Sequence, residues 1–129
     1  MAKERYPLSG YNITAMVAKA TSCTSLIDTM GTSKLAVTTG RVFWMRGMVV
    51  TNEHATTGGA LEVWDEAEAG TPAAPTAANQ RLTVYVGPTE TVVLDFPAPG
   101  IKFITGVCGT CEATMTVNAF GVQCFGYEE

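Results

Sequence analysis

The sequence has few charged residues and a modest excess of acid. Charged side chains make up 16% of the 129 residues, below the share of about a quarter that is usual in soluble domains. Eight basic and twelve acidic residues give a net charge of −4. Proteins that bind nucleic acids normally carry a basic stripe, so we expect no nucleic-acid partner.

Long hydrophobic runs are also missing, although hydrophobic residues make up 47% of the chain. No stretch reaches the roughly 18 apolar residues that indicate a membrane-spanning helix, so we expect no membrane partner. Lys3, Glu4 and Arg5 interrupt any early apolar run, which argues against a secretory signal peptide. The length and the apolar content are those of one domain with its own core.

Sequence signatures of catalysis are absent as well. The chain contains no Gly-x-Ser-x-Gly motif, no phosphate-binding loop and no dinucleotide fingerprint. His54 is the single histidine, and Asp65 or Glu53 is a candidate to orient it. An exposed loop histidine is the simpler interpretation. We therefore expect a non-enzymatic protein with no catalytic residue and no cofactor.

The four cysteines include one CxxC pair, Cys108 and Cys111. We expect Gly109-Thr110 to be a two-residue hairpin turn, so that the two thiols face each other across the strands. A zinc ribbon needs two such pairs, and in a cytoplasmic protein thiols stay reduced. The prediction is reduced structural cysteines and no metal, with a disulfide or a zinc site at Cys108 and Cys111 as the alternatives.

Alternating apolar residues and turn signals dominate the rest of the chain. Val, Thr and Gly are frequent, and Leu82, Val84 and Val86 point to one side of the segment 80–86. In the same way, Val92, Leu94 and Phe96 form one face of 90–96. Further strands are expected over 34–38, 41–52, 61–65, 101–107 and 111–120. This pattern predicts an all-β fold, an antiparallel β-sandwich or a jelly-roll-like barrel of about eight strands.

The segment 41–52, RVFWMRGMVVTN, reads as a strand that is apolar on both of its faces. A strand buried on both faces lies between two layers or against another subunit. Two further aromatic residues alternate with inward-facing valines and are candidates for exposed platforms or subunit contacts. The candidate interface therefore comprises Val42, Phe43, Trp44, Met45, Trp64 and Tyr85.

The first third of the chain is less regular. Residues 1–9, which include Arg5, are expected to form an arm that orders on a neighbouring molecule. Residues 11–20 read as a strand or a short helix, and residues 22–30 as weakly helical or irregular. The predicted organisation is an arm and irregular segment over 1–33, followed by a β-sandwich over 34–129, in one globular unit.

Residues 66–79, EAEAGTPAAPTAAN, contain no large apolar side chain. So long a connection without secondary structure is uncommon in a compact domain. It is either a projecting contact loop or a solvated connection. Asp65, Glu66 and Glu68 form an acidic cluster at its start, and without a calcium-loop motif we interpret the cluster as solvated.

Several segments carry a resemblance to a known class of protein. They are RGMVVTN at 46–52, LEVWD at 61–65, TVVLDF at 91–96, GIKFITGV at 100–107, and the alternating residues 114–120. In this order they resemble small structural proteins of tailed bacteriophage virions, in particular capsid decoration, or cement, proteins. The resemblance spans residues 41–129.

The resemblance implies a compact β domain, often trimeric, on the outside of the virus head. The implied partner is the shell of major capsid protein, whose subunits the domain would bridge, and the implied location is the capsid exterior after synthesis in the host cytoplasm. The alternative is a carbohydrate or host-surface binding module, such as a tail or fibre-tip component, with Trp64 and Tyr85 in the site.

Overall fold

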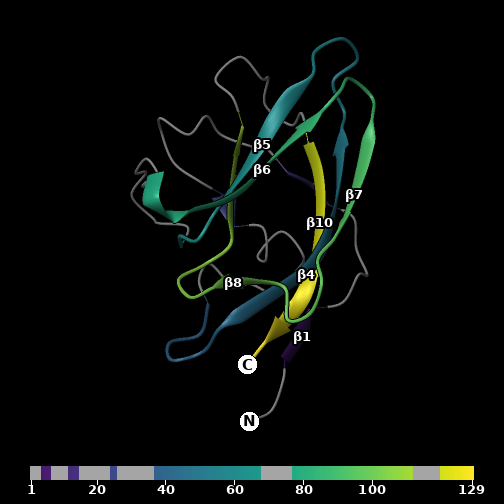
Figure 1. Cartoon of the computed structure of the whole chain (residues 1–129). Helices are drawn as coiled ribbons and strands as arrows, with labels where there is room; N and C mark the ends of the chain where they lie inside the picture. Colours follow the sequence, from purple (N-terminus) through teal and green to yellow (C-terminus); the bar gives the residue numbers. More distant parts are fainter. Residues whose placement is uncertain (1–3, 7–11, 15–23, 26–36, 68–76, 112–119) are drawn as a thin grey trace.

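Strands dominate the computed structural model, which describes residues 4–6, 12–14, 24–25, 37–67, 77–111 and 120–129 (Figure 1). Most of the described elements follow residue 42, where the sequence alternates most clearly. They are β4 (Phe43–Asn52), β5 (Gly59–Trp64), η2 (Ala77–Asn79), β6 (Gln80–Val86), β7 (Thr91–Asp95), β8 (Ile101–Phe103), β9 (Cys108–Cys111) and β10 (Phe120–Glu128). Three short strands precede them, β1 (Glu4–Tyr6), β2 (Asn12–Thr14) and β3 (Thr24–Ser25). The predicted all-β class is confirmed.

The strands form two sheets in which every pair is antiparallel. The first sheet has the order β1-β10-β4-β7, with β2 beside β1 on β10 and β8 beside β7 on β4. The second sheet has the order β3-β9-β5-β6. Strands β1 and β2 share one edge position beside β10, and β7 and β8 share one edge position beside β4. Counted by position, each sheet has four, and their order is that of a jelly roll, which is a double layer of two such sheets.

The main core lies between the two sheets. Met48 and Phe120 of the first sheet and Leu61 and Val63 of the second have no exposed surface. The predicted inner faces of β6 and β7 are confirmed, because their alternate apolar residues pack against this core while remaining partly exposed: Leu82, Val84, Val92 and Leu94. Such alternation is what a sheet with one solvated face requires.

The prediction that 41–52 is buried on both faces is wrong. Met45 is opposite Gly126 and Gly47 is opposite Phe125, so Arg46 is an extra residue, a β-bulge, in β4. A bulge reverses which residues point inward. Phe43 and Met45 before it and Met48 and Val50 after it therefore all reach the same core and have no exposed surface.

The strand that is buried on both faces is β5. All six of its residues are buried. Leu61 and Val63 point into the main core, whereas Trp64 joins Cys108 in a second cluster on the opposite face. Glu62 also lies on that opposite face and is 6% exposed. Two-sided burial thus occurs in the second sheet and not in the segment whose composition suggested it.

Several predicted boundaries change. The strand expected over 101–107 ends at Phe103, since the next backbone amides bind Asp65. Thr24 and Ser25, within the segment expected to be weakly helical, are strand β3. Strands β1, β2 and β3 pair with β10 and β9, so these parts of 1–33 belong to the sheets. Most of the strand expected at 34–38 and residues 112–119 lie outside the described residues.

The C-terminal strand β10 was not predicted, although it lies at the centre of the first sheet between β1 and β4. Its inner residues alternate from Phe120 to Glu128. Among the described residues, no helix has the length and apolar character needed to cross a membrane.

Candidate functional site

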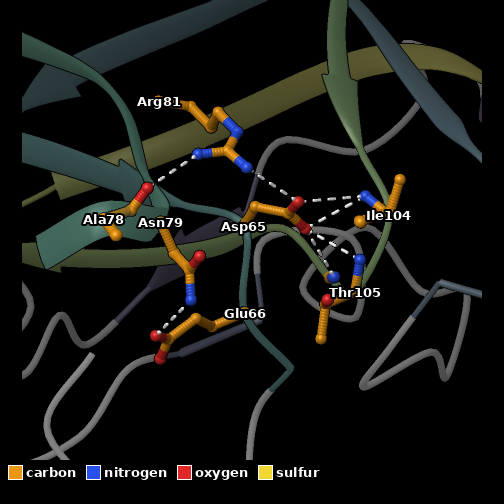
Figure 2. Close-up of polar contacts among 8 residues, drawn as sticks. Asp65, Glu66, Ala78, Asn79, Arg81, Ile104 and Thr105 are labelled. Atoms are coloured by element: carbon orange, nitrogen blue, oxygen red, sulfur yellow. Dashed lines mark hydrogen bonds and ion pairs between the residues drawn. The ribbon is translucent and has the colours of Figure 1, made fainter. Parts of the chain in front are cut away.

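The largest polar cluster of the described residues centres on Asp65, which directly follows β5. Its carboxylate is 3% exposed. Oδ1 accepts hydrogen bonds from the backbone amides of Ile104, Thr105 and Gly106 at 3.0, 2.8 and 3.2 Å (Figure 2). Oδ2 receives Nη2 of Arg81 at 3.1 Å. Charge-assisted bonds of this kind stabilise a buried carboxylate, and here they hold the 104–106 turn against β5.

The same cluster ties together the ends of β5 and β6. The Asp65 amide donates to the carbonyl oxygen of Asn79 at 2.8 Å, and the Asn79 side chain donates to Glu66 Oε1 at 3.0 Å. Arg81 Nη1 donates to the carbonyl oxygen of Ala78 at 3.3 Å (Figure 2). The interpretation of Asp65 as part of a solvated acidic cluster is therefore wrong. Glu68 lies outside the described residues.

A second cluster surrounds Asn52 and His54 at the other end of β5. The buried Asn52 amide donates to the carbonyl oxygens of Thr57 and Val86, at 2.8 and 3.1 Å, and its Oδ1 accepts from the His54 amide. His54 Nδ1 in turn accepts from the amides of Thr56 and Thr57 at 3.3 and 3.0 Å. His54 shapes this loop. It lies at the opposite end of β5 from Asp65, so Asp65, one of the two candidates to orient it, does not do so.

A third polar cluster, around the buried carboxylate of Glu128, closes the C-terminal end of the first sheet. Glu128, which has no exposed surface, accepts the Thr38 amide at 2.7 Å and the Thr38 hydroxyl at 2.8 Å. Val42 and Glu129 exchange backbone hydrogen bonds beside it. Sequence reasoning missed Glu128. The available signal was that it continues the inward alternation of Phe120, Val122 and Cys124.

The CxxC pair is not a hairpin turn. Cys108 to Cys111 is strand β9, and residues three apart on a strand point to opposite faces. Cys111 lies in the main core and Cys108 in the cluster with Trp64. The two thiols therefore do not face each other, which removes the geometry of a shared disulfide or zinc site.

Cys108, Cys111 and Cys124 are all buried. Burial raises the pKa of the Cys124 thiol to about 12, and a backbone hydrogen bond opposes the rise in part. Such a thiol stays protonated and is a poor nucleophile. In the part of the chain that the structure describes, no three His, Cys, Asp or Glu side chains gather as they would around a metal ion.

The predicted interface residues divide into buried and accessible groups. Phe43 and Met45 have no exposed surface and Trp64 is 4% exposed, so these three are interior residues. Trp64 Nε1 donates to the buried Thr110 hydroxyl at 2.9 Å. Tyr85 is 66% exposed, on the outer side of β6.

The accessible group continues on the outer face of the first sheet. Trp44 is half-buried there and is paired with Tyr127 of β10. Of Arg5, the structure gives the backbone pairing of β1 with Tyr127. The half-buried Phe125 lies over Gly47 at the bulge. Val42, just before β4, is also half-buried. Sequence reasoning missed Phe125 and Tyr127, because it did not identify β10.

An aromatic stripe of Trp44, Phe125 and Tyr127 thus lies on this face.

Comparison with known proteins adds no relative: no family model matches the chain, and no curated protein and no solved structure matches it.

Proposed function

We propose that the protein is a non-enzymatic structural component of a bacteriophage virion, of the kind that decorates the capsid exterior. It binds the assembled shell of major capsid protein and stabilises the head by bridging shell subunits. The observation that carries the proposal is the aromatic stripe of Trp44, Phe125 and Tyr127 on the outer face of a jelly-roll sandwich. Jelly rolls are common among viral capsid proteins and lectins.

The use of the buried polar groups supports a structural role. The side chains best suited to acid–base chemistry, Asp65, His54 and Glu128, each accept hydrogen bonds from backbone amides of neighbouring loops. A general base must instead reach a substrate proton. These groups set the shape of the loops at the strand ends, which is what a binding scaffold requires.

The aromatic stripe has the composition of a protein-binding surface. Aromatic residues are enriched in interfaces and supply much of their binding energy. A half-buried aromatic side chain also loses little freedom on binding, because its own sheet already restrains it. We assign contact with the shell to this stripe.

The test uses capsids assembled without the protein. Binding of the purified chain is measured by cosedimentation, for the wild type and for Tyr127→Ala and Tyr85→Ala. Tyr127→Ala should weaken binding by about tenfold or more, the usual effect of losing an interface anchor. Tyr85→Ala, on the outer side of the other sheet, should leave binding unchanged. If the wild-type chain does not bind such capsids, the proposed function is wrong.

The alternative, a carbohydrate or host-surface binding module, is supported by the exposed Tyr85. The hydroxyl end of its ring lies beside Gly58, where an added Cβ would collide with it. The other half of the expected platform is missing, since Trp64 is buried. Glycan-array binding that Tyr85→Ala abolishes would favour this alternative over the capsid proposal.

A further inference from the structure

Two of the edge strands of the sandwich differ in how they are protected. Among the described strands, β6 ends one side of the second sheet, and β7 together with β8 ends one side of the first; β3 and the pair β1 and β2 are at the opposite ends. The β6 edge has a bulge at Arg81, since Val63 is opposite Leu82 and Trp64 is opposite Gln80. Bulges and charges are devices that prevent edge strands from pairing with other chains.

Strand β7, with the sequence TVVLD, has none of these devices within its first four residues. It runs along the outer margin of the molecule (Figure 1). Val93 at its centre is 69% exposed, the most exposed large hydrophobic side chain among the described residues. The residues flanking the strand, 88–90 and 97–99, are exposed too, so the approach to this edge is open.

The hydrogen-bond pattern shows which backbone groups of β7 point outward. The Asn52 amide donates to Glu90 and the Phe96 amide donates to Arg46, both at 2.9 Å. Hydrogen-bonded pairs alternate along an antiparallel ladder. The even residues Val92 and Leu94 therefore bond to β4, and the odd residues 91, 93 and 95 direct their amides and carbonyls away from it.

We propose that β7 pairs with the β7 strand of a second copy of this chain around a two-fold axis at Val93. In this antiparallel register Val93 faces Val93 of the second copy, and Thr91 faces the second copy's Asp95. Each of these outward-facing residues then donates and accepts one backbone hydrogen bond. Val92 of one copy meets Leu94 of the other on the inner side, so the partly exposed core residues of β7 become covered.

The absence of like-charge contacts favours a second copy as the occupant of this edge. No like charges are opposite each other in the register, because Asp95 faces Thr91. Extending the register by one residue brings Glu90 of the second copy opposite the uncharged Phe96. The Glu90 carboxylate already accepts a hydrogen bond from the Gly87 amide of its own chain at 3.0 Å, so it is not left unsatisfied at the contact.

This contact is independent of the proposed function and revises one expectation attached to it. The resemblance to decoration proteins predicts a trimer, whereas an isologous contact of this kind closes a dimer. It extends the first sheet across two chains and leaves the aromatic stripe of each copy accessible.

The first experiment measures the mass of the full chain in solution over a dilution series, under reducing conditions. A reversible dimer is expected. Val93→Lys places two like charges together at the axis and should weaken dimerisation by about tenfold or more. Ile104→Lys is the matched control, because Ile104 is also an exposed apolar residue, at 56%, but lies outside β7. It should dimerise as the wild type does.

A second readout uses the wild-type chain. Amide exchange measured by NMR should show Val92 and Leu94 protected at every concentration. The amides of residues 91, 93 and 95 should become protected only in the dimer.

A third readout is cross-linking. Val93→Cys should form a covalent dimer on mild oxidation, because facing hydrogen-bonded residues lie about 5.5 Å apart, a spacing that a disulfide can span. The control Ile104→Cys should form none.

A wild-type chain that is monomeric at all concentrations overturns the proposal. So does a dimer or trimer in which residues 91, 93 and 95 exchange as fast as in the monomer. Neither result affects the proposed function, which is decided by binding to capsids.

Discussion

Strands β4 and β5 are both rich in apolar residues, yet only β5 is buried on both faces. In β4 the bulge at Arg46 turns Phe43, Met45, Met48 and Val50 toward one core. In β5 the regular alternation places Leu61 and Val63 on one side and Trp64 on the other, and both sides are buried. A dense apolar run therefore does not reveal how many of its faces are covered.

The comparison predicts unequal losses of stability for truncating a tryptophan in each strand, and this is the largest expected effect. Trp64→Ala removes a fully packed side chain and its hydrogen bond to Thr110, and should lower the free energy of unfolding by about 3–5 kcal/mol. Trp44→Ala, on the half-buried outer face of β4, should cost about 1–2 kcal/mol. Urea denaturation measures both. Equal costs would mean that the two strands are covered alike.

The end of β5 provides the next test. Asp65→Ala leaves the buried amides of Ile104, Thr105 and Gly106 without their acceptor, and should cost about 3 kcal/mol. Arg81→Met removes the ion pair and the exposed hydrogen bond to the Ala78 carbonyl oxygen. Because the Arg81 side chain is 31% exposed, the substitution should cost less than about 1 kcal/mol. Thermal and urea unfolding of the two variants are the measurements. A mild Asp65→Ala would show that the 104–106 turn does not depend on the carboxylate.

The bulge itself is tested at Gly47. A Cβ added there would collide with the Phe125 ring and lie 2.6 Å from the Leu94 carbonyl oxygen. Gly47→Ala should therefore destabilise the chain by about 1–3 kcal/mol, as overpacking does. The double variant with Phe125→Ala should recover part of the loss, leaving the contact with Leu94. No recovery would mean that the Phe125 ring does not lie over Gly47.

The smallest effect concerns Cys124, which is opposite Met48 on the core side of the bulge. Its pKa is raised to about 12 by burial, while in the unfolded chain the thiol ionises at its ordinary, lower pKa. Its contribution to stability is thus complete below the unfolded pKa and is lost as the pH rises toward the folded one. The loss is about 1.4 kcal/mol per pH unit above about pH 9. Unfolding free energies of wild type and Cys124→Ala, measured from pH 8 to 10, should diverge in this way. Parallel curves would show that Cys124 is accessible to water.

Strands with regular alternation were predictable. Segments 80–86 and 90–96 have the inner faces that were expected, because on a regular strand the side-chain period of two follows from the backbone alone. The bulge in β4 was not predictable from periodicity, since it consists of a single extra residue set by the pairing with β10.

The candidate site was less predictable than the fold. Among the predicted interface residues, Trp44 is half-buried and Tyr85 is exposed, but Trp64, which looked equally accessible, is buried. Asp65 looked like part of a solvated loop. Its role depends on the 104–106 amides, which lie 39 to 41 residues away along the chain, and no local pattern encodes such a partner.

The sequence by itself determined the all-β class, the alternation of the outer strands and the low charge of the chain. These properties depend on composition and on neighbours two residues apart. The tertiary structure decided that β5 is covered on both faces, that Cys108 and Cys111 point apart, and that β7 is an edge. Burial of a second face and exposure of an edge depend on which distant segments pack together, and that is settled only when the sheets assemble.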